Sequence, residues 1–101
     1  MKPTYSKTDG TRVETSVIDR RVRETKKMLT LAADGCCERC NTNQGRLCWS
    51  HIVSIKWAKE NGHAEYCWDK MNMELLCEKH HLEIESRTAE KRLEYYNSRK
   101  H

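Results

Sequence analysis

The sequence predicts a small α+β domain in which two helices flank a pair of strands. Three observations lead to this class. The chain has 101 residues, the size of a single domain. Apolar residues recur at helical spacing near both ends and alternate in between. Only 37% of the residues are apolar and six are cysteines, so a small core would benefit from a metal constraint.

The N-terminal third is expected to hold an arm and a helix. Residues 1–15 are polar, contain the only proline and predict a flexible or partner-dependent arm. The helix is predicted to begin at Ser16, where Asp19 completes a capping-box-like start, and to end at Gly35. Its expected buried stripe is Ile18, Val22, Thr25, Leu29 and Ala32. Residues 16–101 are therefore assigned to one domain.

The remainder predicts a ββα unit. Residues 46–53 and 71–77 are short and apolar-rich, with the alternation that is typical of strands. The connection between them is long for a hairpin, and connections of this length are often functional. A second helix is predicted over residues 78–97, with a buried line of Leu82, Ser86, Ala89, Leu93 and Tyr96.

The cysteines are interpreted as metal ligands rather than disulfide partners. No apolar signal segment opens the sequence, and no run approaches the roughly 18 residues of a membrane span. A reduced, cytoplasmic protein without membrane association is therefore expected, and in that compartment cysteines near histidines favour metal binding.

Two ligand pairs indicate a structural zinc site. Cys37 and Cys40 form a Cys-x-x-Cys turn, and Cys77 and His80 supply a second pair with the same spacing. Tetrahedral zinc takes four such ligands. Cys36 could replace Cys37 as the partner of Cys40, although the shorter spacing is the commoner one.

A second set of residues gives the sequence a family resemblance. The order Cys-x-x-Cys, His-Ile and Asn-x-x-x-Leu-Cys-x-x-His-His resembles the HNH endonuclease family, named for His, Asn and His, in its zinc-bearing form. The match covers residues 37–88, about half of the chain. The resemblance implies the ββα-metal fold, to which the N-terminal helix would be an addition.

The resemblance also implies catalytic roles. His51 matches the general base that activates water, and His81 matches the ligand of a catalytic divalent ion, Mn²⁺ or Mg²⁺. Asn72 matches the middle residue, whose amide would hold the His51 loop against the second strand. Taken alone, Asn72 could be only a turn residue.

One position departs from the family pattern. The family usually has Asp or His immediately before the general base, where this chain has Ser50. A serine hydroxyl is a poor ligand for Mg²⁺ or Mn²⁺. Glu85 lies one helical turn beyond His81 and could supply a further ligand, or could be an ordinary solvated glutamate.

The charge distribution permits a nucleic-acid partner. The formal net charge is +4, and residues 1–34 carry eight Lys or Arg against five Asp or Glu. Arg20, Arg21 and Lys27 lie off the apolar stripe and are the candidate DNA contacts, with a solvated helix face as the alternative.

The function expected from these residues is that of a metal-dependent DNA endonuclease that hydrolyses phosphodiester bonds and nicks one strand. The protein would act as a monomer, or as a homodimer for double-strand cleavage. The alternative is a non-catalytic zinc module that binds nucleic acid and has a decayed nuclease site. A purely structural zinc fold within a larger assembly is a third interpretation, which leaves His51 and Asn72 unexplained.

Overall fold

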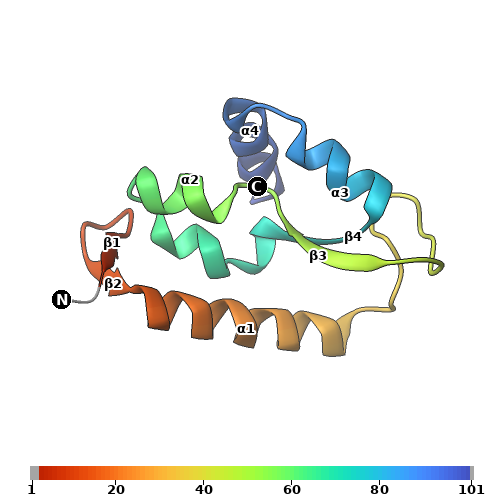
Figure 1. Ribbon diagram of the computed structural model, residues 1–101, viewed down its shortest axis with the longest axis horizontal. Coiled ribbons are helices and arrows are strands. Elements are labelled where there is room, and N and C mark those ends of the chain that lie inside the picture. Colours follow the sequence, from red (N-terminus) through yellow and green to blue (C-terminus); the bar gives the residue numbers. More distant parts are fainter. Residues whose placement is uncertain (1–2, 101) are drawn as a thin grey trace.

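The described part of the chain, residues 3–100, folds into helices and two short antiparallel β-hairpins in the computed structural model (Figure 1). The predicted α+β class is confirmed. One hairpin lies at the N-terminal end of the molecule, and the other lies between α1 on one side and α3 on the other (Figure 1). The principal extents of 43 × 28 × 25 Å show an elongated domain.

The first fifteen residues contain a hairpin where the sequence predicted a flexible arm. Strands β1 (Thr4–Ser6) and β2 (Arg12–Glu14) pair antiparallel. Gly10 has a φ of +87° and donates its N–H to the Lys7 carbonyl, which closes the turn. The Asp9-Gly10 turn signal was missed because the flanking residues are mostly polar. The division of the chain at residue 15 stays a prediction.

Helix α1 (Thr15–Ala32) continues directly from the hairpin. Its N-cap is Glu14, without a side-chain cap, so the predicted capping box at Ser16 is wrong. The helix also ends before Gly35, because Ala33 already has extended backbone angles. Of the predicted stripe, Ile18 and Val22 are buried, Thr25 and Leu29 are half-buried, and Ala32 is exposed.

The central hairpin consists of β3 (Leu47–His51) and β4 (Met73–Cys77). They pair antiparallel with Ser50 opposite Glu74. The long connection between them carries three short elements, which are α2 (Ile55–Glu60), η1 (Ala64–Trp68) and η2 (Lys70–Asn72). The main apolar cluster joins α1 to these elements and to β4, through Ile18, Val22, Ala58, Cys67 and Met73.

The C-terminal segment forms two helices instead of the one that was predicted. Helix α3 (Glu78–Glu85) stops at Ser86, and α4 (Ala89–Arg99) starts after Thr88, whose hydroxyl accepts from Lys91 N–H as an N-cap. The predicted buried line fails at the break, since Leu82, Ser86 and Ala89 are exposed. Ile84 is buried in their place, and Tyr96 is buried as predicted.

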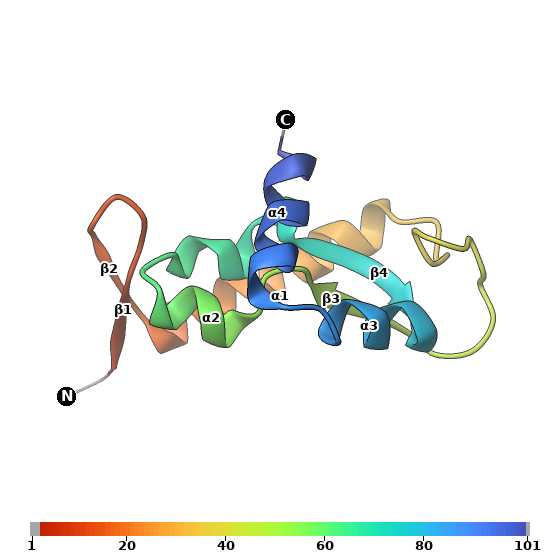
Figure 2. The ribbon, with the colours of Figure 1, turned by 90° about the horizontal axis from the view of Figure 1, so that it is seen from above.

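The two C-terminal helices point in different directions. Helix α3 lies along the central hairpin, whereas α4 crosses it and carries the C-terminal end away from the sheet (Figure 2). Within residues 3–100, no helix combines the length and the apolar character that a membrane span requires.

Candidate functional site

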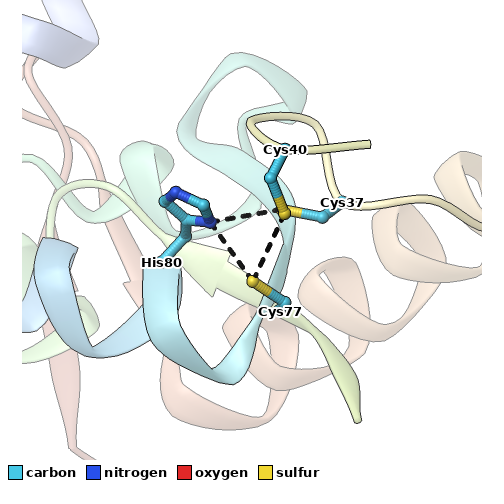
Figure 3. A group of neighbouring side chains, drawn as sticks. All are labelled: Cys37, Cys40, Cys77 and His80. Atoms are coloured by element: carbon cyan, nitrogen blue, oxygen red, sulfur yellow. Dashed lines mark hydrogen bonds between the residues drawn. The ribbon is translucent and has the colours of Figure 1, made fainter. Parts of the chain in front are cut away.

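Four ligand-type side chains converge at one end of the central hairpin. Cys37, Cys40, Cys77 and His80 place their Sγ atoms and one imidazole nitrogen within 4.8 Å of one another (Figure 3). Cys37 Sγ lies 3.7 Å from His80 Nδ1, and Cys77 Sγ lies 3.2 Å from the same nitrogen. Cys40 Sγ lies 3.7 Å from Cys77 Sγ.

Local hydrogen bonds fold the Cys37–Cys40 turn and fasten it to β4. The Asn41 N–H donates to the Cys37 carbonyl, and Asn41 adopts a φ of +63° that reverses the chain. Glu38 N–H donates to the Leu75 carbonyl, and Leu75 N–H donates to the Glu38 carboxylate at 2.6 Å. The turn therefore stands beside the end of β4, where Cys77 and the first turn of α3 supply the other pair.

The surroundings of Cys37 favour the thiolate. Burial by itself would raise the pKa of this thiol, but hydrogen bonds from the backbone N–H groups of Cys40, Cys77 and Arg39 outweigh it and lower the pKa to about 6. The thiolate is the form that binds metals.

These residues could hold a metal ion such as zinc. With Zn–S bonds of about 2.3 Å and Zn–N bonds of about 2.0 Å, neighbouring ligand atoms in a tetrahedron lie roughly 3.5–3.8 Å apart. Three of the six separations, at 3.2–3.7 Å, are close to this range, and all six lie within 4.8 Å. A disulfide requires a sulfur separation of about 2.05 Å, and all six cysteines are free. Cys36, the alternative ligand, lies outside the group of four.

A second polar group adjoins the first, because His81 follows His80. Ser50 Oγ lies 2.5 Å from His81 Nδ1, and Glu85 Oε1 lies 3.1 Å from His81 Nε2. Since a carboxylate only accepts, Nε2 carries a proton in its contact with Glu85, and the Ser50 hydroxyl is the hydrogen-bond partner of Nδ1. Ser50 is 2% exposed, whereas the Glu85 side chain is 53% exposed. The group thus opens to solvent at its carboxylate end.

His51 uses a different partner. Its Nε2 lies 2.8 Å from the Cys67 carbonyl, which only accepts, so Nε2 carries the proton and Nδ1 keeps a free lone pair. Burial lowers the pKa of His51, partly opposed by this hydrogen bond, and the positive charges of Lys26 and Arg92 lower it further. The imidazole is therefore neutral near pH 7, as a general base must be.

The hydrogen bonds of the described residues do not connect His51 to the group formed by Ser50, His81 and Glu85. Successive strand residues face opposite sides of a sheet, so Ser50 faces α3 while His51 faces the other side. The two consecutive residues therefore belong to different polar groups at the end of β3.

Asn72 is a fully buried positioning residue. Its Oδ1 accepts the Val53 N–H at 2.7 Å, and its Nδ2 donates to the carbonyls of Val53 at 3.0 Å and Tyr66 at 2.9 Å. Its own carbonyl accepts the Ile52 N–H. Asn72 therefore ties the segment that follows His51 to the start of β4 and to η1.

Arg92 is a functional candidate that the sequence analysis missed. Its guanidinium donates to the His51 carbonyl at 2.9 Å and to the Ile52 carbonyl at 2.6 Å. It therefore fixes the backbone that carries the His51 ring. Nothing in the local sequence reveals this role, because the contact joins positions about 40 residues apart.

The predicted DNA contacts lie along α1 and do not form one cluster. Arg20 pairs with Glu24 at 3.6 Å. The guanidinium of Arg21 lies 5.1 Å from the centre of the Trp68 ring, and Lys27 is exposed. Arg20 and Arg21 thus differ in their contacts, since Arg20 pairs with a carboxylate and Arg21 lies over an aromatic ring.

Comparison with known proteins adds no relationship. No protein-family model, curated protein or solved structure matches this chain. Its function has to be inferred from its own residues.

Proposed function

We propose that this protein is a zinc-containing, metal-dependent DNA endonuclease of the HNH type that hydrolyses phosphodiester bonds one strand at a time. Cys37, Cys40, Cys77 and His80 bind the structural zinc ion in this proposal. His51 is the general base, Asn72 orients the loop that carries it, and His81 contributes to a catalytic divalent-ion site.

The observation that carries the proposal is the state of the His51 ring. The proton on Nε2 is committed to the Cys67 carbonyl at 2.8 Å, and the half-buried ring is neutral at physiological pH. Its Nδ1 can therefore accept a proton from water. Arg92 contacts the His51 carbonyl and Asn72 accepts the Val53 N–H, so the backbone that follows this ring is held at two points, which supports a fixed orientation.

Binding of a divalent ion near His81 requires one ring nitrogen to exchange its hydrogen bond with Ser50 or Glu85 for a bond to the metal. A hydroxyl from Ser50, an imidazole from His81 and a carboxylate from Glu85 lie in one hydrogen-bonded row. Mixed nitrogen and oxygen donors suit Mn²⁺ better than Mg²⁺, which prefers oxygen ligands alone. A divalent ion bound there supplies charge stabilisation for the phosphate undergoing cleavage.

The test is an assay of supercoiled plasmid with a panel of divalent ions. Wild type should convert the plasmid to the nicked form, most efficiently with Mn²⁺. His51→Ala should reduce the rate by roughly 10²- to 10⁴-fold, since loss of a general base removes that much. Zinc content and melting temperature should stay unchanged, and a wild type that leaves the plasmid intact with every ion would refute the proposal.

Ser50 favours one alternative function. The hydroxyl occupies the position where the family usually has a metal ligand, and it is buried against His81. A nuclease site that has lost its metal would leave a zinc-containing module that binds nucleic acid without cutting it. DNA binding without cleavage in the same assay would identify this function.

A further inference from the structure

A cavity of about 540 Å³ opens between the tip of the N-terminal hairpin, α1, η1 and the end of α4. Lys7, Arg21 and Lys100 contribute cations to its wall from three separate elements, and Tyr66 and Trp68 contribute aromatic rings. The hairpin tip and the C-terminal end of α4 both extend toward the upper side of Figure 2. Positive charges that lie far apart in the sequence thus gather around one opening.

The aromatic wall of this cavity is rigid. Tyr66 stacks on His63 with ring centres 4.7 Å apart, and its other neighbour, Tyr96, is also 4.7 Å away. Trp57 extends the stack beyond His63 at 5.7 Å. The Trp68 carbonyl accepts a hydrogen bond from the Thr25 hydroxyl of α1 at 3.0 Å. A ligand would therefore meet a preformed surface.

The hairpin tip is fastened to the same wall. Thr8 donates its N–H to Glu65 Oε2 at 2.8 Å and its hydroxyl to Glu65 Oε1 at 2.6 Å. The Thr8 hydroxyl also lies 2.7 Å from His63 Nδ1. These contacts hold the hairpin tip, and with it Lys7, at the rim of the cavity and orient the Glu65 carboxylate toward Thr8.

The cations of the wall form long ion pairs or none among residues 3–100. Asp9 accepts hydrogen bonds from the N–H and hydroxyl of Thr11, and lies 4.0 Å from Lys7. Arg21 lies over the Trp68 ring, and within residues 3–100 it forms no ion pair with a carboxylate. Lys100 lies over the rings of Tyr66 and Tyr96 and reaches Asp69 only at 3.8 Å. Three cations line the cavity against the two carboxylates of Asp9 and Glu65, so the excess charge favours an anion.

The cavity adjoins the segment that positions His51. Trp68, on the wall, follows Cys67, whose carbonyl accepts the His51 N–H. Helix α1 runs beside η1 from Arg21 to Lys26, whose charge acts on His51. A polyanion that passes His51 could reach the cavity along η1 and α1.

We propose that this cavity binds a backbone phosphate of the DNA substrate, away from the bond that is cleaved, through Arg21, Lys7 and Lys100. The identity of the anion rests on the proposed nuclease function. The three cations would contact phosphate oxygens, and the Trp68 ring would keep the Arg21 guanidinium in place.

The experiment compares two neighbouring arginines. Binding of a fluorescent 20-base-pair DNA is measured by anisotropy at several salt concentrations, with zinc-loaded protein and no added Mg²⁺ or Mn²⁺. Arg21→Gln and Lys7→Gln should each weaken binding roughly three- to tenfold and reduce the salt slope by about 1, as loss of one phosphate contact predicts. Arg20→Gln loses the same charge outside the cavity, where Glu24 already pairs with the guanidinium, so it should have little effect, and Arg20 would then not be one of the DNA contacts.

Hydrolysis of bis(p-nitrophenyl) phosphate separates this proposal from the nuclease proposal, because the small phosphodiester does not span both sites. Arg21→Gln and Lys7→Gln should hydrolyse it like wild type. If wild type cuts neither substrate but the binding pattern holds, the cavity proposal stands and the nuclease proposal falls. Equal losses for Arg20→Gln and Arg21→Gln, or poly-glutamate binding as tight as DNA binding, would overturn the cavity proposal. Lys7→Gln is the variant less prone to misfold, since within residues 3–100 the Lys7 side chain forms a single ion pair, with Asp9 at 4.0 Å.

Discussion

His80 and His81 are consecutive residues on the first turn of α3, yet they belong to two chemically different groups. His80 joins three thiols, whose ligand atoms lie within 4.8 Å of one another. His81 joins a hydroxyl and a carboxylate, which bind its two nitrogens from opposite sides. The first group contains only thiols and an imidazole, which are donors that suit zinc. The second group combines a hydroxyl, an imidazole and a carboxylate, which form hydrogen bonds with one another.

Helix geometry explains how one turn serves both groups. Consecutive residues on an α-helix point about 100° apart, so the two imidazoles leave α3 in different directions. The buried carboxylate of Glu74 connects the two regions. It pairs with Arg39 of the cysteine turn at 3.3 Å and lies opposite Ser50 in the hairpin. The comparison shows that two polar groups of different chemistry can lie side by side on one helical turn without sharing a side chain.

Removal of zinc should give the largest effect and would show that the cysteine group alone maintains the fold. Structural zinc contributes on the order of 10 kcal/mol to the folding of small domains. A chelator should therefore abolish cooperative thermal unfolding, and elemental analysis before treatment should find about one zinc per chain. Circular dichroism and calorimetry would measure the change.

A pair of adjacent cysteines provides the control. Cys37→Ser should lose zinc and unfold, because Cys37 is a buried member of the group of four. Cys36→Ser should retain both zinc and stability. The reverse order would assign the ligand to Cys36 and contradict the geometry described above.

The elements that local sequence signals encode could be predicted, and the long-range contacts could not. Hydrophobic periodicity gave the strands of the central hairpin and the helix around Ile18 and Val22. Spacing gave the four metal-ligand residues, since Cys-x-x-Cys and Cys-x-x-His are local patterns. The break between α3 and α4 was missed because Leu82, Leu93 and Tyr96 continue an apparent stripe across it, although Leu82 is exposed.

The candidate site shows the same division. Ser50, His81 and Glu85 were singled out one by one, but their hydrogen-bonded row depends on the pairing of β3 with β4 and α3. The role of Arg92 depends on how α4 crosses the end of β3, which no local pattern determines. The sequence therefore identified the individual candidate residues but not the residues with which they form hydrogen bonds.

Replacement of Asn72 should destabilise the protein without releasing zinc, which would separate the two regions. Asn72→Ala removes three side-chain hydrogen bonds to the backbone of Val53 and Tyr66. Each buried group left unpaired costs about 1–3 kcal/mol, so the free energy of unfolding should fall by on the order of 3 kcal/mol. Urea unfolding of the zinc-loaded protein would measure it.

Asn61 is the matched control for this change. Its amide also donates to a backbone carbonyl, that of Trp57, but the residue is exposed. Asn61→Ala should change stability by less than about 0.5 kcal/mol. Zinc loss from Asn72→Ala at neutral pH would mean that the two regions do not behave independently.

Replacement of Arg92 should affect catalysis by the proposed nuclease more than binding. Lysine keeps the charge but cannot contact the carbonyls of His51 and Ile52 with the same fork. Arg92→Lys should lower kcat roughly tenfold with little change in KM, because a small displacement of His51 disturbs its alignment. Lys91→Arg, on the exposed neighbouring position, should behave like wild type, and a change confined to KM would argue against a positioning role.

Substitutions at Ser50 and Glu85 should change the metal dependence of cleavage and give the smallest effect of these variants. They would test the difference between the four-ligand cysteine group and the group around His81, which has one carboxylate. If Glu85 supplies the single carboxylate of the catalytic ion site, Glu85→Ala should raise the Mn²⁺ concentration for half-maximal cleavage severalfold, while Glu94→Ala should not. Ser50→Asp would add a carboxylate beside His81, so it should lower that concentration and improve cleavage with Mg²⁺. Titrations of nicking rate against each ion measure both changes. If the Glu85→Ala variant cuts DNA like wild type at limiting metal, Glu85 does not bind the ion. It would then be a surface residue whose contact with His81 serves only to orient the imidazole.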